Sequence, residues 1–134
     1  GYGSYDQNTV ASVDDAFDLT AALNVNVGAI KLGVQKKLHN EGEGAAATTD
    51  AVWYKDTVMG VAYAINDSLS ISYNRYESDK HNNTGAPDQE TDAFNIGYTI
   101  GGMTIGFQEA QTDNANHVTA TEDDTRTLGI SVAF

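Results

Sequence analysis

The sequence predicts an all-β fold, an antiparallel transmembrane β-barrel, and three observations lead to this expectation. Apolar residues recur at every second position through most of the 134-residue chain, which is the period of a half-buried strand. Short turns and long polar loops alternate between these runs. The polar side of the runs is almost uncharged, whereas a soluble barrel presents a well-charged outer surface.

The alternation predicts about eight strands in this chain. In the run from Phe17 to Val27, for example, large apolar residues alternate with Asp18, Thr20 and Asn24. We expect the strands, in order, from Gly1 to about Gln7, from Phe17 to Val27, from Ile30, from Trp53 to Ile65, from Leu69, from Phe94 to Ile100, from Met103, and from about Thr125 to Phe134. No run approaches about eighteen apolar residues, so a transmembrane helix is not expected.

The connections between the expected strands fall into two classes. Short turns are expected at 26–29, 66–68 and 101–102, of which Gly101-Gly102 is a two-residue hairpin signal. Long polar loops are expected at 8–15, 40–50, 78–92 and 111–124. In a meander, successive connections lie at opposite ends, so all short turns share one rim and all long loops share the other.

Charge is sorted between these two rims. The chain has 19 acidic and 7 basic residues, a net charge of −12, and only Asp67 among the acidic residues belongs to the short-turn rim. Outer-membrane barrels have short periplasmic turns and longer extracellular loops. Such an acidic chain also argues against nucleic acid as a partner, because nucleic-acid binders carry basic surfaces.

The polar side of the strands suits the wall of a water-filled pore, and the apolar side suits lipid. By strand phase we expect twelve residues to line the water: Thr20, Asn24, Lys31, Gln35, Lys37, Ser70, Ser72, Asn95, Thr99, Thr104, Gln108 and Ser131. Lys31 and Lys37 form a basic stripe there, which either tunes ion preference or is ordinary wall charge that meets water.

The polar side also bears on the size of the barrel. An eight-stranded barrel has an interior that side chains must fill, yet this side carries small residues such as Gly60, Gly97, Gly106 and Gly129. The opening strand is also shorter than the roughly 9–11 residues that a spanning strand needs. We therefore expect a segment of a larger barrel, and the alternative is a complete eight-stranded barrel.

The last expected strand carries a polar residue, a glycine, an apolar residue and an aromatic residue in this order: Thr127, Gly129, Val132 and Phe134. They match the insertion signal of Gram-negative outer-membrane porins, and the chain resembles the C-terminal part of that family. The stretches 60–69 and 94–107 are similar to a porin strand, periplasmic turn and returning strand. The resemblance covers about residues 15–134 and is nearest to the porins of alphaproteobacteria.

The resemblance implies that residues 1–134 are a single β-barrel segment, the C-terminal half of a porin. It implies a homotrimer of 16-stranded barrels in the bacterial outer membrane, through which small hydrophilic solutes and ions diffuse passively. It also implies periplasmic short turns, extracellular long loops, and recognition of the C-terminal strand by the barrel-assembly machinery. The constriction loop of the family lies in its N-terminal half, and nothing in this chain matches it.

Two other functions remain open. A complete eight-stranded outer-membrane barrel would act as an anchor or adhesin without conduction. An outer-membrane hydrolase would need a histidine beside a carboxylate or serine, and His81 near Asp79 or His117 near Asp113 could serve. Nothing ranks these above surface histidines, so we expect no enzyme, no cofactor and no metal site.

Four basic residues share the apolar phase near the long-loop ends of their strands, namely Lys36, Lys55, Arg75 and Arg126. One hypothesis is a basic belt for lipopolysaccharide phosphates, because arginine binds phosphate through paired hydrogen bonds. Lys36 and Arg75 lie only six residues from their strand starts, which places them within the apolar band, where a charge costs about 2–4 kcal/mol. Snorkelling, a bulge or a subunit interface would relieve that cost.

Overall fold

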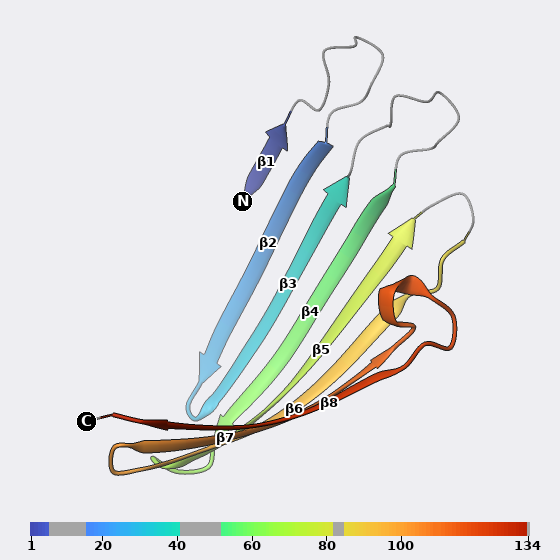
Figure 1. Ribbon diagram of the computed structural model, residues 1–134. Coiled ribbons are helices and arrows are strands. Elements are labelled where there is room, and N and C mark those ends of the chain that lie inside the picture. The colour runs from blue at the N-terminus through green and yellow to red at the C-terminus, as the bar shows by residue number, and fades with distance from the viewer. Residues whose placement is uncertain (6–15, 41–51, 82–84, 134) are drawn as a thin grey trace.

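Eight antiparallel strands form one sheet, in which every strand pairs with its neighbours in the sequence. The computed structural model describes residues 1–5, 16–40, 52–81 and 85–133. The strands are β1 (Tyr2–Tyr5), β2 (Ala16–Val27), β3 (Ile30–Asn40), β4 (Trp53–Ala64), β5 (Leu69–His81), β6 (Gln89–Ile100), β7 (Met103–Asp113) and β8 (Asp123–Val132). A short 3-10 turn, η1 (Ala115–His117), lies between β7 and β8. The sheet is curved but not closed, because β1 and β8 remain its two edges (Figure 1).

The short connections follow from local turn chemistry. Gly28 and Gly101 each have a φ of 58°, the left-handed conformation that two-residue hairpin turns require and that glycine adopts without a steric penalty. In the third turn, the Asn66 side-chain oxygen accepts hydrogen bonds from the backbone N–H groups of Ser68 and Leu69, both at 2.9 Å. These turns confirm the three hairpins expected from the sequence.

The register aligns the apolar positions of successive strands. One row of directly paired residues crosses seven strands and is apolar throughout: Val27, Ile30, Tyr63, Ile71, Ile96, Phe107 and Leu128. Because side chains alternate between the two faces of a strand, this row places all the alternating apolar residues on one face. We call this the apolar face and the opposite one the polar face.

Four strands extend into segments that the sequence predicts to be loops. Ser78–His81 belong to β5 and Gln89–Asp92 belong to β6, although we expected a loop over 78–92. Likewise, 111–113 lie in β7 and 123–124 lie in β8. Backbone pairing continues through these polar segments because a ladder needs no apolar side chains once it is aligned. Asn40, expected in the loop 40–50, belongs to β3. The expected loop 8–15 and the rest of the loop 40–50, together with Gln7 and Phe134, lie outside the described residues.

The described residues build no hydrophobic core. Among them only Ala16, Ser78 and Ala115 are buried, and no large side chain is fully buried. The chain exposes 9101 Å², whereas a compact soluble protein of 14.3 kDa exposes about 6,800 Å². Both faces of the sheet are therefore surfaces, and the large apolar residues lie on one of them.

The turn at Gly28 provides a test of the hairpin geometry. We expect Gly28→Val to destabilise the fold by about 1–2 kcal/mol, because a branched side chain disfavours the left-handed conformation. The matched control is Gly106→Val, since Gly106 has no positive φ and a Cβ there meets nothing within 4 Å. Urea unfolding in detergent micelles measures both variants, and equal losses would contradict the assignment of strain to Gly28.

Candidate functional site

All twelve residues that the sequence places toward water share the polar face. The register sets Asn24 opposite Gly33, Ser72 opposite Asn95 and Thr104 opposite Ser131, and the other predicted positions lie in the same phase. Hydroxyl and amide groups therefore cover this face from β2 to β8. Their role as a pore lining stays a prediction, but their common face is a feature of the structure.

Two asparagines lie flat against the middle of the polar face. A Cβ built on Gly33 would come within 2.8 Å of the side-chain oxygen of Asn24, and one on Gly60 within 2.5 Å of that of Asn74. The two glycines thus leave the space that the amides occupy. The result is a shallow polar hollow in which Lys31 is the only charged residue among the described lining residues.

On the polar face, the ion pairs of the described residues lie toward the long-loop end, on β2 and β3. Asp18 accepts from His39 Nδ1 at 2.8 Å and pairs with Lys37 Nζ at 3.2 Å. Lys37 is therefore paired, whereas no partner is seen for Lys31 in the described part of the chain. Of the basic stripe that the sequence predicts, Lys31 therefore keeps an unpaired charge within the described residues.

A second polar cluster lies two strands further along. Asp56 of β4 accepts hydrogen bonds from the Tyr76 hydroxyl at 3.1 Å and the Ser78 hydroxyl at 2.7 Å. Beside it, the ring of Tyr54 lies 6.2 Å from that of His39 and 5.7 Å from that of His117, and Lys80 Nζ lies 5.3 Å from its centre. The sequence indicated none of these contacts, because no local spacing announces cross-strand neighbours.

The apolar face carries a belt with two parallel edges. From β3 to β8, the unbroken apolar run ends toward the long loops at Val34 and Met59 in one row, at Tyr73 and Phe94 two residues lower, and at Phe107 and Leu128 two residues lower again. Its other edge descends in the same way, from Val27–Ile30 to Ile65–Leu69 to Ile100–Met103. The belt therefore shifts by two residues for every two strands crossed.

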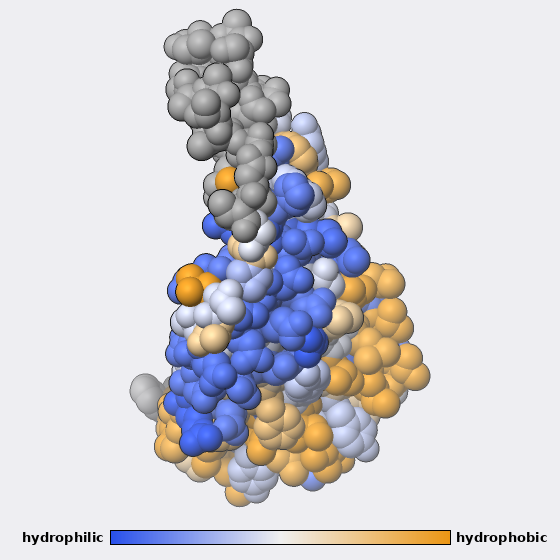
Figure 2. Space-filling view, turned by 90° about the vertical axis from the view of Figure 1, so that its right-hand side faces the viewer, coloured by the Kyte–Doolittle hydropathy of each residue, from blue (hydrophilic) through white to orange (hydrophobic). Residues whose placement is uncertain are grey.

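On β3 and on β5 to β8, the next residue of this face above the belt is charged, and on β4 it is Thr57. Figure 2 shows hydrophilic side chains over the left and centre of the view and hydrophobic side chains at its right and along its lower margin. On β2 and β3 the apolar residues extend further, through Leu19 and Leu38, which are directly paired. The apolar run is thus longest on β2, and it holds three or four residues on each strand from β3 to β8.

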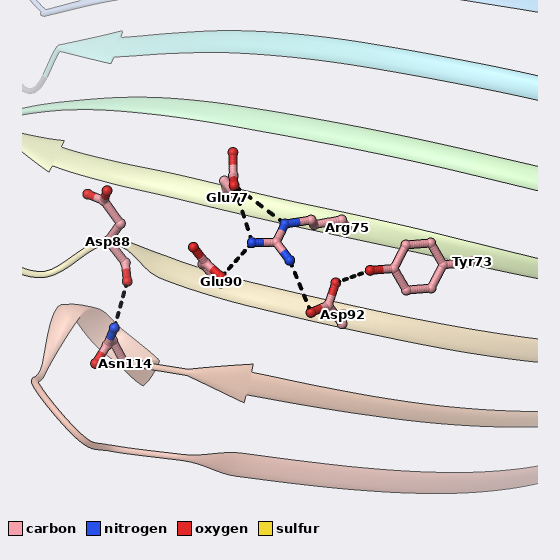
Figure 3. Close-up of polar contacts among 7 residues, drawn as sticks. All are labelled: Tyr73, Arg75, Glu77, Asp88, Glu90, Asp92 and Asn114. Carbon is pink, nitrogen blue, oxygen red and sulfur yellow. Dashed lines mark hydrogen bonds and ion pairs between the residues drawn. The ribbon is translucent and has the colours of Figure 1, made fainter.

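Arg75 is the centre of the charged zone above the belt (Figure 3). Its guanidinium lies 2.5 Å from Glu90, 3.4 Å from Asp92 and 3.4 Å from Glu77, and Asp92 also accepts a hydrogen bond from the Tyr73 hydroxyl. These side chains come from the neighbouring strands β5 and β6. Three carboxylates around one cation leave a net negative cluster.

The four basic residues proposed for lipopolysaccharide all lie on the apolar face, as the sequence predicts. Besides Arg75, Lys55 pairs with Asp79 at 3.5 Å and Arg126 pairs with Glu109 at 2.8 Å. Lys36 has no ion pair within the described residues. Direct phosphate binding by the two arginines and Lys55 would thus compete with their present carboxylate partners, and the belt stays a prediction.

The remaining predicted residues belong to the C-terminal strand. Thr127 and Gly129 of β8 lie on the polar face and Val132 on the apolar face, paired with Met103. Phe134 lies outside the described residues. The alternation that the insertion signal requires is present in the described part, and its recognition by assembly machinery stays a prediction.

In neither histidine–carboxylate pair considered from the sequence do the two side chains contact each other within the described residues, where His81 stacks on Trp53 and Asp79 pairs with Lys55. His117 lies 3.4 Å from Ser78 Oγ through Nε2, but its Nδ1 faces the Pro87 carbonyl rather than a carboxylate. Ser78 is only 3% exposed, so a substrate could not reach its hydroxyl. Within 1–5, 16–40, 52–81 and 85–133, no group of three or more histidine, cysteine, aspartate or glutamate side chains could hold a metal.

The Arg75 cluster provides a test of the charged zone. We expect Arg75→Ala to lower the thermal unfolding temperature more than Arg126→Ala, because it leaves three carboxylates of one cluster without their cation. Arg126 is the matched control, since its side chain is 75% exposed and has one carboxylate partner at 2.8 Å. The temperature at which the folded band disappears on a denaturing gel measures both, and a larger loss for Arg126→Ala would contradict this account.

No family model matches the chain, and neither a curated protein nor a solved structure matches it. No helix within the described residues is long and apolar enough to cross a membrane. The case for a function therefore rests on the two faces of the sheet and on the belt.

Proposed function

We propose that the chain forms part of the wall of an outer-membrane porin, which passes small hydrophilic solutes and ions passively. The main observation behind this proposal is the apolar belt, whose two edges descend together from β3 to β8. In a barrel the strands tilt relative to the axis, so a level belt must shift along the strands from one to the next.

The size of this shift agrees with a membrane barrel. With about 3.3 Å per residue and about 4.8 Å between strands, two residues per two strands correspond to a tilt of ~35°. Strands of transmembrane barrels tilt by roughly 35–45°. The seven long strands of 10–13 residues also suffice to span, since about 9–11 are needed.

The polar face supports an aqueous interior. Its middle carries hydroxyls, amides and glycines, and a narrow eight-stranded barrel would need bulkier side chains to fill its centre. We therefore propose that the eight strands belong to a larger barrel of 16, as the C-terminal half of the porin. A complete eight-stranded barrel that anchors or adheres is the second candidate, and the count of eight strands is the observation that favours it.

The partners follow from the same two faces. Lipid would cover the belt, and lipopolysaccharide would meet the charged zone above it, where Lys36 has no carboxylate partner among the described residues. The taller apolar strip through Leu19 and Leu38 suits a neighbouring subunit of a homotrimer. The short-turn rim would face the periplasm and the acidic rim the outside, and the protein would need neither a cofactor nor a catalytic residue.

Adjacent residues of β7 test which face meets lipid. We expect Ile105→Lys to reduce folding into vesicles, because a lysine in the centre of the lipid-facing belt costs about 2–4 kcal/mol. Thr104→Lys is the matched control: it lies next in sequence on the polar face, where the charge stays in water. The folded fraction after vesicle insertion measures both. If Thr104→Lys were the more damaging change, the assignment of the faces would be wrong.

Conduction tests the pore itself. In planar bilayers we expect stable channels, and we expect Lys31→Gln to shift the reversal potential toward cation preference because it removes a wall charge. Lys36→Gln, which removes the same charge from the apolar face, should leave the reversal potential unchanged. A folded protein that never conducts would support the anchor or adhesin instead, and equal shifts for both variants would contradict the proposed lining.

A further inference from the structure

The connection between β7 and β8 folds over the polar face. His117 of η1 touches the Ser78 hydroxyl on β5 and the Tyr54 ring on β4, and both of those side chains point to the polar face. The connection thus reaches past β6, the neighbour of β7, to the two strands beyond it. We call residues 114–121 the strap.

Contacts, rather than local preference, hold the strap in place. The Asn114 side chain donates to the Asp88 carbonyl at 3.0 Å, and the Asn116 N–H donates to the Gln89 side chain at 2.8 Å. His117 and Ala120 have φ values of 59° and 58°, which are unfavourable for residues with a Cβ. Such strain persists only where the surroundings maintain it, so loss of a contact should loosen the strap.

His117 of the strap belongs to a chain of hydrogen bonds in which the donor of each bond can be assigned. His117 Nδ1 lies 3.1 Å from the Pro87 carbonyl, which only accepts, so Nδ1 carries a hydrogen. Ser78 has a single hydroxyl hydrogen and donates it to Asp56 at 2.7 Å. In a neutral His117, Nε2 would then face, at 3.4 Å, an oxygen that has no hydrogen left to donate.

Protonation of His117 completes this chain. An imidazolium carries hydrogen on both nitrogens, so Nε2 donates to Ser78 while Ser78 still donates to Asp56. Two groups lie around His117. One is the Asp56 carboxylate, which accepts hydrogen bonds from the hydroxyls of Ser78 and Tyr76. The other is the Tyr54 ring, with Lys80 Nζ on the same ring.

We propose that the strap is a proton-controlled device at the mouth of the pore. Protonated His117 fixes the strap against the polar face and narrows the opening, and neutral His117 releases it. Because the bond from Nε2 exists only in the protonated form, closure is favoured at acidic pH and is lost as the pH rises. The narrowing of a pore rests on the proposed function, whereas the docking of the strap does not.

Spin labels test the docking. The chain has no cysteine, so Ala120→Cys on the strap and Asp67→Cys on the opposite rim give one labelled pair. In the detergent-folded protein we expect a narrow distance distribution at about pH 5 and a broad one at about pH 8, the range in which histidine commonly titrates. His117→Gln and Ser78→Ala should each abolish this pH response.

His81→Gln is the matched control, because His81 stacks on Trp53 on the apolar face, 4.7 Å between ring centres, away from the strap. It should keep the full pH response. If His117→Gln and Ser78→Ala both kept the response of the parent protein, the strap proposal would be overturned.

Conductance separates this proposal from the pore itself. We expect acid to lower single-channel conductance in the parent and in His81→Gln, with loss of this effect in His117→Gln. If the protein conducts but neither its conductance nor its label distances change with pH, the strap proposal is wrong and the pore proposal still holds. If the label distance depends on pH but the protein never conducts, the pore proposal is wrong and the docking of the strap still holds.

Discussion

The structure depends on the alignment of strand register with the two-residue alternation of side chains. A slip of one residue in any pairing would move every side chain of the following strand to the other face. The row from Val27 to Leu128 shows that no such slip occurs between β2 and β8. The separation of the apolar face from the polar face is a direct result of this alignment.

Because the described residues enclose no core, this separation also sets the environment in which the sheet is stable. Leu23 and Ile130 are 62% and 63% exposed, and burial of such side chains typically contributes 1.5–3 kcal/mol each. Under the proposed function, lipid or a neighbouring subunit would provide that burial without a second layer of the same chain. The backbone groups of the inner strands are paired within the sheet, as a bilayer would demand.

The alternation was sufficient to predict the strand number, the hairpin turns and the face on which each of the twelve polar residues lies. It was insufficient at the long-loop ends. The segments around Ser78 and Gln89 look like loops because they are polar, yet they pair directly in the ladder. There the partner strand, and not the side chains of the segment, decides where pairing stops.

The sequence by itself determined the all-β class, the two faces and the position of the charge at one rim, since these follow from a period of two residues along the chain. Only the tertiary structure decided the incline of the belt, the carboxylates around Arg75 and the contact between Ser78 and His117, which are 39 residues apart. These features depend on which residues face each other across strands and on how a loop folds back. No local pattern encodes either relation.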